Sequence, residues 1–239
     1  MGVPVRSTRC AACPPPRLRA ACLLWLALWL PGNGWALPMW NFDTVMARAE
    51  LRYGQLGSAE QRLRAWQTML DQAQGLPPRQ QLDAVNRFFN RQLSFRDDQQ
   101  IWGQDDYWAT PVEALVKGAG DCEDYAIAKY FSLRRLGVPA QNLRITYVKA
   151  LQQRNQAHMV LAWYEAPEAD PLVLDNLVAD IAPASQRDDL VPVYAFSAEG
   201  LFLAGSGGAE VRNGDAKRLS RWQAVLRKMD AEGFPIGQG

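Results

Sequence analysis

The sequence predicts an α+β fold in which a helical N-terminal part packs on an antiparallel sheet. Two observations support this class. From Asn41 to Leu93, apolar residues recur at three-to-four spacing, which is typical of amphipathic helices. After Leu143 the chain changes to short apolar runs separated by polar turns, which indicates strands. This order predicts that helices come first and that an antiparallel meander follows them.

Residues 1–36 are predicted to be a cleavable signal peptide that directs export. Their charged side chains are four arginines, and an apolar run of eleven residues follows over Ala20–Leu30. Small residues at Gly34 and Ala36 precede a predicted cut before Leu37, and eleven apolar residues are too few to span a bilayer as a helix. An uncleaved anchor is the alternative. The remaining residues, 37–239, are predicted to form one folded domain.

Loss of the leader makes the remaining chain slightly acidic. The whole chain has 26 basic and 25 acidic side chains, so removal of four arginines leaves 22 against 25, a net charge of −3. Nucleic-acid binding needs a basic face, so nucleic acid is not an expected partner. No later stretch is apolar enough to cross a bilayer, so stable membrane insertion is not expected either.

Capping and stop signals place the first helices. Ser58 with Gln61 predicts a capping box at the start of a helix, and Gly75 with Pro77 ends that helix. A second helical pattern then continues to Leu93. The stretch 94–106 is rich in Asp and Gln and is predicted to be a loop.

Two further helix starts follow the predicted loop. Thr110 and Pro111 are typical of an N-cap and a first helical residue, and this short helix is predicted to end in a flexible Gly-Ala-Gly segment at 118–120. Asp121 is predicted to cap the next helix, which runs to about Leu136.

The strands are predicted over Leu143–Val148, His158–Tyr164 and Leu172–Val178, with a fourth over Val191–Phe196. A final amphipathic helix carries the apolar residues Leu219, Trp222, Val225, Leu226 and Met229.

Cys122 is the candidate nucleophile. The other three cysteines lie in the predicted leader, so Cys122 cannot form an internal disulfide after cleavage. In the first turn of a helix, unpaired backbone N–H groups and the helix dipole can lower a thiol pKa from about 8.5 toward neutrality. The same N–H groups could stabilise an oxyanion. A small buried residue at a helix start is the alternative interpretation.

His158 and Asp175 are the candidate base and its partner. His158 is the single histidine of the chain, and a lone strand histidine is more often a satisfied polar group than a catalyst. If the strands turn at Ala166–Ala169, Asp175 faces Val160 and lies diagonally from His158 on the same face, at about 7–8 Å between backbones. A shift of register by one residue would move Asp175 to the opposite face.

The acids beside the cysteine have two possible roles. Asp121, Glu123 and Asp124 would each disfavour a nearby thiolate by like-charge repulsion. Acids in a first helical turn are also ordinary capping groups. A bound cation would cancel the repulsion, and closely spaced carboxylates are oxygen ligands that suit calcium.

Several of these segments resemble the bacterial transglutaminase-like cysteine proteinases, and within them the periplasmic LapG-type adhesin proteases. The matching segments are Gly120-Asp-Cys-Glu-Asp-Tyr-Ala126, His158 at a strand start, Leu174-Asp-Asn-Leu177, and Trp108-Ala-Thr-Pro-Val-Glu113. The resemblance implies a papain/transglutaminase-like core with Cys122 as nucleophile, His158 as general base and then acid, and Asp175 as the orienter of the imidazole. It also implies calcium binding by Asp121 and Glu123, with Asp124 as a further candidate ligand.

The same resemblance implies a substrate, a regulator and a location. The substrate would be a large surface adhesin, cut in its N-terminal region near a pair of alanines, and its release would promote biofilm dispersal. An inner-membrane receptor for cyclic di-GMP would inhibit the protease. The location would be the periplasm, which agrees with the predicted leader.

Three alternative functions use the same residues differently. A transglutaminase would pass the acyl group from the same Cys-His-Asp triad to an amine. A cell-wall peptidase would also be exported and thiol-dependent, although the chain has no wall-binding repeat. A binding module that kept the fold but lost activity is the third, and the retention of all three triad residues argues against it.

Overall fold

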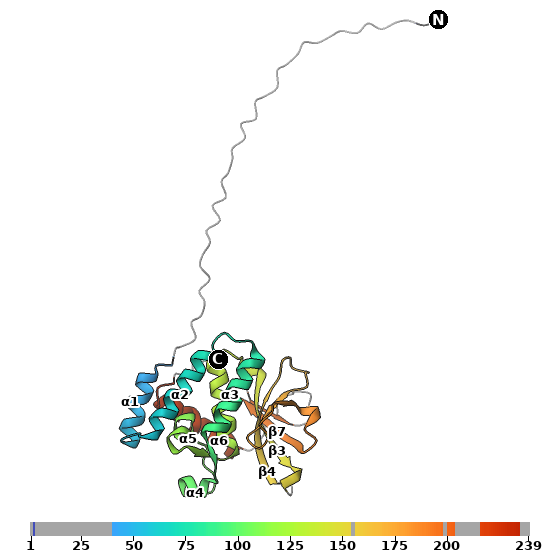
Figure 1. Cartoon of the computed structure of the whole chain (residues 1–239). Coiled ribbons are helices and arrows are strands. Elements are labelled where there is room, and N and C mark those ends of the chain that lie inside the picture. Colours follow the sequence, from blue (N-terminus) through green and yellow to red (C-terminus); the bar gives the residue numbers. More distant parts are fainter. Residues whose placement is uncertain (1, 3–39, 154–155, 198–199, 204–215, 235–239) are drawn as a thin grey trace. The chain divides into compact units, whose positions relative to one another are not determined.

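Helices come first in the structure and strands follow, so the α+β class is confirmed. The computed structural model describes residues 2, 40–153, 156–197, 200–203 and 216–234 (Figure 1). The predicted signal peptide, residues 1–36, lies outside the described residues apart from Gly2, and it stays a prediction. Within the described ranges, no helix is both long and apolar enough to cross a membrane.

Six helices precede the large sheet in the described chain. They are α1 (Phe42–Tyr53), α2 (Ser58–Ala73), α3 (Pro78–Gln92), α4 (Asp98–Trp102), α5 (Pro111–Lys117) and α6 (Cys122–Arg135). The predicted stops after α2 and the predicted starts of α5 and α6 agree with these bounds. Thr110 caps α5 through a capping box with Glu113, as its sequence position indicates.

The capping box predicted at Ser58 and Gln61 is wrong. Helix α2 begins at Ser58 itself, and its N-cap is Gly57, whose φ of 53° lies in the left-handed region that glycine adopts without strain. The Ser58 hydroxyl instead accepts a hydrogen bond from Arg62 at 3.2 Å. Glycine therefore turns the chain into the helix one residue earlier than the capping pattern suggests.

The loop predicted over 94–106 contains regular structure, and so does the segment predicted to be flexible. Strand β1 (Ser94–Phe95) pairs in parallel with β2 (Ala119–Gly120), and α4 follows β1. A Cβ atom added to Gly120 would lie 2.8 Å from that of Asp124, so only glycine allows this approach. The pairing joins segments far apart in sequence, which local composition cannot reveal.

The main sheet has six antiparallel strands in the order β6-β5-β4-β3-β7-β8. Strands β3, β4 and β5 follow the predicted meander and β6, which was not predicted, extends it, but β7 crosses back to pair with the free edge of β3. A meander of all four predicted strands is therefore wrong for the last one. The bounds are β3 (Leu143–Ala150), β4 (Gln156–Trp163), β5 (Leu172–Leu174), β6 (Ala182–Pro183), β7 (Leu190–Ser197) and β8 (Gly200–Leu203).

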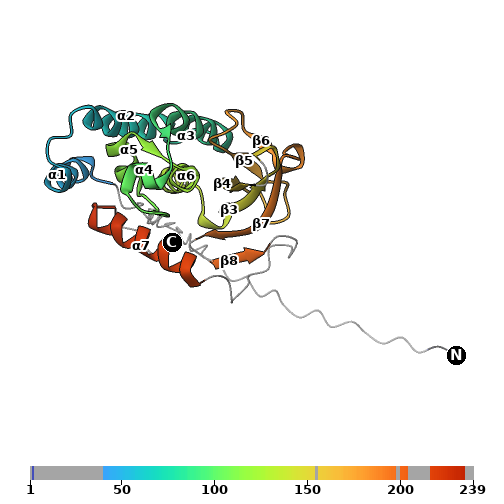
Figure 2. The same cartoon turned by 90° about the horizontal axis from the view of Figure 1, so that it is seen from below.

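Helix α6 lies in the interior, between the sheet and the other helices (Figure 2). It packs against β3 and β4 on one side and against α3 and α5 on the other. Every residue from Glu123 to Leu133 is buried. A helix buried all round is held by its neighbours rather than by its own propensity, so the position of its first turn is fixed by the whole core.

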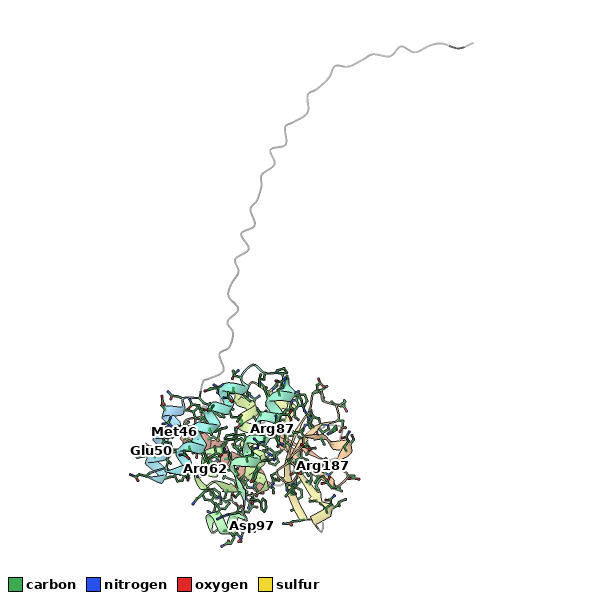
Figure 3. All side chains as sticks on the ribbon, in the orientation of Figure 1. Met46, Glu50, Arg62, Arg87, Asp97 and Arg187 are labelled. Atoms are coloured by element: carbon green, nitrogen blue, oxygen red, sulfur yellow. The ribbon has the colours of Figure 1, made fainter. Side chains whose placement is uncertain are left out.

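The C-terminal helix α7 (Ala216–Ala231) returns to the helical part. Its Trp222 ring stacks on Phe131 of α6 with centroids 5.4 Å apart. Lys228 donates to the backbone oxygen of Trp108 at 2.6 Å. Elsewhere, the half-buried Arg62, which Figure 3 labels, joins α2 to the end of α5 by donating to the Leu115 oxygen at 2.6 Å.

Trp66 is the centre of the aromatic core, and its removal should destabilise the fold strongly. The side chain is fully buried, contacts the rings of Trp40, Phe42, Phe89 and Phe234, and donates to the Ser132 hydroxyl at 2.9 Å. Trp66→Ala should lower the free energy of unfolding by about 3–5 kcal/mol in denaturant titrations. Leu51→Ala, at a side chain that is 89% exposed, should change it by less than about 0.5 kcal/mol. Equal losses in the two variants would contradict this assignment of the core.

Candidate active site

Cys122 occupies the first position of α6, as the sequence predicts. Asp121 is the N-cap, and its backbone N–H donates to the Asp124 carboxylate at 3.4 Å. The cysteine is free and partly buried. Strand β2 delivers the chain to this point, so the nucleophile candidate lies where a fixed strand meets the N-terminus of a buried helix.

Cys122 and His158 line the same pocket. Its volume is about 180 Å³, and it opens between α6, the sheet and the segment before α5. Helix α6 packs directly against β4, which carries the histidine, and this packing brings together two residues far apart in sequence. The pocket is lined by Asp106, Trp108, Cys122, Glu123, Tyr147, Ala157, His158, Met159 and Arg221.

His158 and Asp175 form a buried pair. The observed register pairs Leu161 with Leu174 and Trp163 with Leu172, which is the predicted register. It places Asp175, the residue after β5, on the same face as His158. Nε2 of the histidine lies 2.8 Å from Oδ1 of the aspartate, and the two residues are 4% and 1% exposed. Because Nε2 faces the carboxylate, Nδ1 is the ring nitrogen left for the thiol.

The Asp175 residue is held by donors from several elements. Besides His158, its Oδ1 accepts the Leu177 N–H at 3.0 Å, and its Oδ2 accepts from Arg187 at 2.7 Å. Burial alone would raise the pKa of Asp175, but these hydrogen bonds and charges outweigh it and hold that pKa well below its usual range. Asp175 is therefore a fixed anion behind the imidazole.

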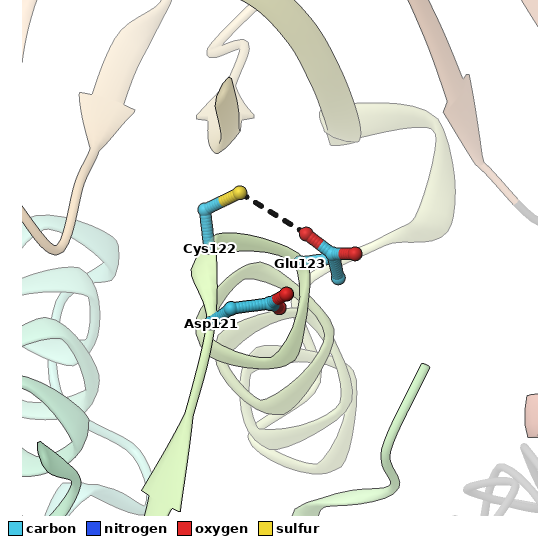
Figure 4. A group of neighbouring side chains, drawn as sticks. All are labelled: Asp121, Cys122 and Glu123. Atoms are coloured by element: carbon cyan, nitrogen blue, oxygen red, sulfur yellow. Dashed lines mark hydrogen bonds between the residues drawn. The ribbon is translucent and has the colours of Figure 1, made fainter. Parts of the chain in front are cut away.

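The thiol has a different environment. Its Sγ donates to Oε2 of Glu123 at 3.0 Å (Figure 4). Burial first, and then the charges of Glu123 and Asp121, raise the pKa of Cys122 well above its ordinary value, although the backbone of Met159 acts in the opposite direction. Without a compensating positive charge, these carboxylates oppose the lowering of the Cys122 pKa that the helix N-terminus would cause.

Those carboxylates belong to a dense acidic cluster. Asp98, Asp121 and Asp124 bring oxygen atoms within 4.8 Å of one another, and Asp98, Asp106 and Glu123 do the same. Burial raises the pKa of Asp98 to about 6. Burial, with the charges of Glu123 and Asp124, raises the pKa of Asp121 to about 10. This density of carboxylates disfavours their own ionisation unless a positive charge is present.

The cluster fits a hard divalent cation. In the described part of the structure, the buried Oδ1 atoms of Asp98 and Asp121 have no hydrogen-bond partner. Unpartnered buried oxygens at ligand spacing are the donor set that calcium takes. Asp124 is less free, because its Oδ1 accepts the Ala109 N–H at 2.7 Å. The three predicted acids are thus brought together, and two more join them.

Sequence reasoning missed Asp98 and Asp106 because it treated their segment as a polar loop. The short helix α4 buries Asp98, which is 3% exposed, and its carboxylate accepts the Tyr107 N–H. Nothing in the local sequence distinguishes Asp98 from the other acids of this Asp-rich stretch or indicates that it is buried. Arg187 and Lys129 were missed as well, because their contacts with Asp175 depend on tertiary packing.

The geometry agrees with what the comparisons with known proteins show. Residues 60–189 match the family model of the bacterial transglutaminase-like cysteine proteinases. The chain belongs to this family, and it is a cysteine protease. No curated protein sequence matches it.

Solved structures of LapG from Legionella pneumophila resemble the chain along most of its length. One is 45% identical with a TM-score of 0.65, covering 77% of this chain and 97% of LapG. The calcium-bound form is 42% identical with a TM-score of 0.68, covering 79% and 99%. The EGTA-treated form is 45% identical with a TM-score of 0.67, covering 77% and 97%.

The buried Lys129 should make stability depend on pH. It is fully buried, and its ammonium donates to the Asp175 backbone oxygen at 3.1 Å. Burial lowers the pKa of Lys129 from 10.5 to about 7, which the charge of Asp175 only partly offsets. Between these pH values the unfolded chain holds a proton that the folded chain lacks, so the free energy of unfolding should rise with pH by up to about 1.4 kcal/mol per unit.

Lys129→Met should remove that rise, so the wild-type and variant unfolding curves should diverge between about pH 7 and pH 10. Urea titrations across this range measure the effect. Lys149→Met, at an exposed side chain, is the matched control and should run parallel to the wild type. Parallel curves for Lys129→Met as well would show that the buried amine keeps its proton to high pH.

Proposed function

We propose that the protein is an exported, calcium-dependent cysteine endopeptidase with Cys122 as nucleophile, His158 as general base and then acid, and Asp175 as orienter of the imidazole. One observation carries the proposal. His158, which pairs with the buried Asp175 at 2.8 Å, lines the same pocket as a cysteine at a helix N-terminus. Nucleophile, base and orienter are the three parts that thiol acyl transfer needs.

Acylation follows from this arrangement. Nδ1 of His158 takes the thiol proton of Cys122, and the imidazolium is stabilised by Asp175. The thiolate attacks the scissile carbonyl carbon, forming the C–S bond while the C=O π pair moves to the oxygen. Backbone N–H groups at the start of α6 would stabilise that oxyanion. The imidazolium then protonates the leaving amine, and the C–N bond breaks to give the thioester.

Deacylation uses the same groups in reverse. His158 takes a proton from water as the water oxygen attacks the thioester carbonyl. The C–S bond breaks, the thiolate regains its proton from the imidazolium, and a carboxylic acid product leaves. No redox step or organic cofactor is required.

Calcium is the proposed metal, and Asp121 and Glu123, with Asp98, Asp106 and Asp124, are the residues that would hold it. When bound, it would supply positive charge that cancels carboxylate repulsion around the thiol and would hold α4 and the start of α6 together. The unpartnered oxygens of Asp98 and Asp121 support this proposal. The similarity to a calcium-bound LapG structure also supports it.

The proposed substrate is the N-terminal region of a large surface adhesin, cut near a pair of alanines so that the adhesin is released and the biofilm disperses. An inner-membrane cyclic di-GMP receptor is the proposed inhibitor, and the periplasm is the proposed location. Family membership and the likeness to LapG over most of the chain support this assignment. The predicted signal peptide agrees with it.

Asp98 should have opposite effects with and without calcium. In chelator at neutral pH, Asp98→Asn should raise the melting temperature, because the raised pKa of about 6 means that folding disfavours the charged carboxylate. This gain should appear as pH rises from about 4 to about 6. With calcium, the variant should lose part of the stabilisation, which for the wild type reaches about 2.7 kcal/mol at a hundredfold excess over Kd.

Differential scanning fluorimetry with calcium and with EGTA measures both effects. Asp105→Asn is the matched control, because Asp105 lies in the same segment, is exposed, and belongs to neither carboxylate group. A calcium increment in Asp98→Asn equal to that of the control would remove Asp98 from the metal site.

Cys122→Ala should abolish cleavage while leaving the calcium-induced rise in melting temperature. The expected loss is more than roughly 10³-fold in kcat, because no other group replaces the nucleophile. The assay is cleavage of a purified adhesin fragment that contains an alanine pair, with a fragment lacking the pair as control. Cleavage that persists in the variant would refute the mechanism. Incorporation of an added amine instead of hydrolysis would identify a transglutaminase.

A further inference from the structure

The guanidinium of Arg187 is a buried cation that contacts the Asp175 carboxylate. It follows the short 3-10 turn η3 (Ala184–Gln186) and lies on the side of the strands (Figure 3). Its side chain is 6% exposed. One terminal nitrogen lies 2.7 Å from Oδ2 of Asp175, whereas His158 contacts the other oxygen, Oδ1.

A second carboxylate fixes the guanidinium. Asp189 accepts from Nε of Arg187 at 2.8 Å and from a terminal nitrogen at 2.9 Å. These hydrogen bonds raise the pKa of Arg187 despite its burial. Two-point contacts of this kind set the plane of the guanidinium as well as its position. Arg187 therefore reaches Asp175 in a defined orientation.

The two oxygens of the Asp175 carboxylate have different hydrogen-bond donors. Oδ1 accepts from His158 and from the Leu177 N–H, while Oδ2 accepts from Arg187. Rotation of the carboxylate would break all of these contacts. The backbone is held separately, since the Asp175 carbonyl accepts from Asn90 at 2.8 Å and from Lys129 at 3.1 Å.

We propose that Arg187, held by Asp189, is a positioning residue that fixes Oδ2 of Asp175 so that Oδ1 stays on Nε2 of His158. The imidazole is thereby kept in one orientation, with Nδ1 left for the thiol of Cys122. The proposal rests on the proposed function for the roles of these three residues. Arg187 itself acts through Asp175 and does not touch the reacting atoms.

A purely structural role would give a different pattern. Arg187 could simply tie the segment after η3 to the end of β5, and its loss would then lower stability without changing the imidazole. A positioning role requires that the His158–Asp175 contact itself loosens when Arg187 is removed. The two roles are separated by observing the imidazole directly.

The chain offers a clean probe of that contact, because His158 is its single histidine. In purified protein labelled with ¹⁵N-histidine and carrying no histidine tag, every imidazole signal belongs to His158. The buried Nε2–H bonded to Asp175 should give a downfield proton resonance that exchanges slowly with solvent. This resonance reports the orientation of the imidazole without any substrate.

Arg187→Met should weaken or abolish the Nε2–H resonance. Arg187→Lys keeps the charge but not the two-point contact, so it should restore the resonance only in part. Asp189→Asn leaves Arg187 beside Asp175 but loosens it, and should give a smaller loss. Arg64→Met removes an exposed arginine that pairs with Glu60 and should leave the spectrum unchanged.

Kinetics provide the second readout. For Arg187→Met, kcat on the alanine-pair fragment should fall about 10- to 100-fold while KM stays within about twofold, because misplacement of the base affects the chemical step. The rate of Cys122 alkylation should change in parallel and needs no substrate. Asp189→Asn should lower kcat and change the alkylation rate in the same direction, but by a smaller factor.

Two results would overturn the proposal. The first is an Arg187→Met protein that keeps both the Nε2–H resonance and kcat, and a lower melting temperature in that protein would indicate a structural tie. The second applies if Arg187→Met does not fold, and it is an unchanged resonance and kcat in Arg187→Lys and Asp189→Asn. Absence of cleavage by the wild type would instead count against the proposed function, since resonance and alkylation still test the positioning role.

Discussion

The buried carboxylate of Asp175 is the constraint on which the arrangement of the site depends. An uncompensated charge in the interior would cost several kcal/mol, so its partners must come from the surrounding elements. The carboxylate is met by His158 of β4 and by Arg187 in the segment after η3. The backbone oxygen of the same residue accepts from Asn90 of α3 and Lys129 of α6, so Asp175 joins the sheet to the helical layer. The hydrogen bond between His158 and Asp175 also places the imidazole against the helix that carries Cys122.

Helix α6 links the position of Asp175 to the position of the candidate nucleophile. Its first residue is Cys122, and two turns later the same helix presents Lys129 to the backbone of Asp175. Because α6 is buried along nearly its whole length, it cannot slide without disturbing the core. The distance between cysteine and histidine is therefore a property of the packed domain and not of either local segment.

The acidic cluster, by contrast, lowers the stability of the folded state at the candidate metal site. Asp98 is buried and Asp121 is half-buried among other carboxylates, and their pKa values are raised, which means that their charged forms are disfavoured by folding. The C-terminal helix supplies one compensating charge, since Arg221 pairs with Asp106 at 2.6 Å. Within the described residues, the buried Oδ1 atoms of Asp98 and Asp121 have no hydrogen-bond partner, and carboxylates with perturbed pKa values cluster at functional sites.

The sequence by itself determined the elements and the local chemistry. Periodicity and caps located most helices, and apolar runs between polar turns located the first three strands of the meander. A turn at Ala166–Ala169, one of the possibilities that the sequence left open, gives the register that the structure confirms. Cys122 at a capped helix start, with three acids around it, was also readable because capping depends on neighbours in sequence. Only the tertiary structure decided the return of β7 to β3, the burial of Asp98, and the contacts of Lys129 and Arg187 with Asp175. These depend on which distant surfaces meet, and burial and charge pairing are properties of that meeting rather than of any segment.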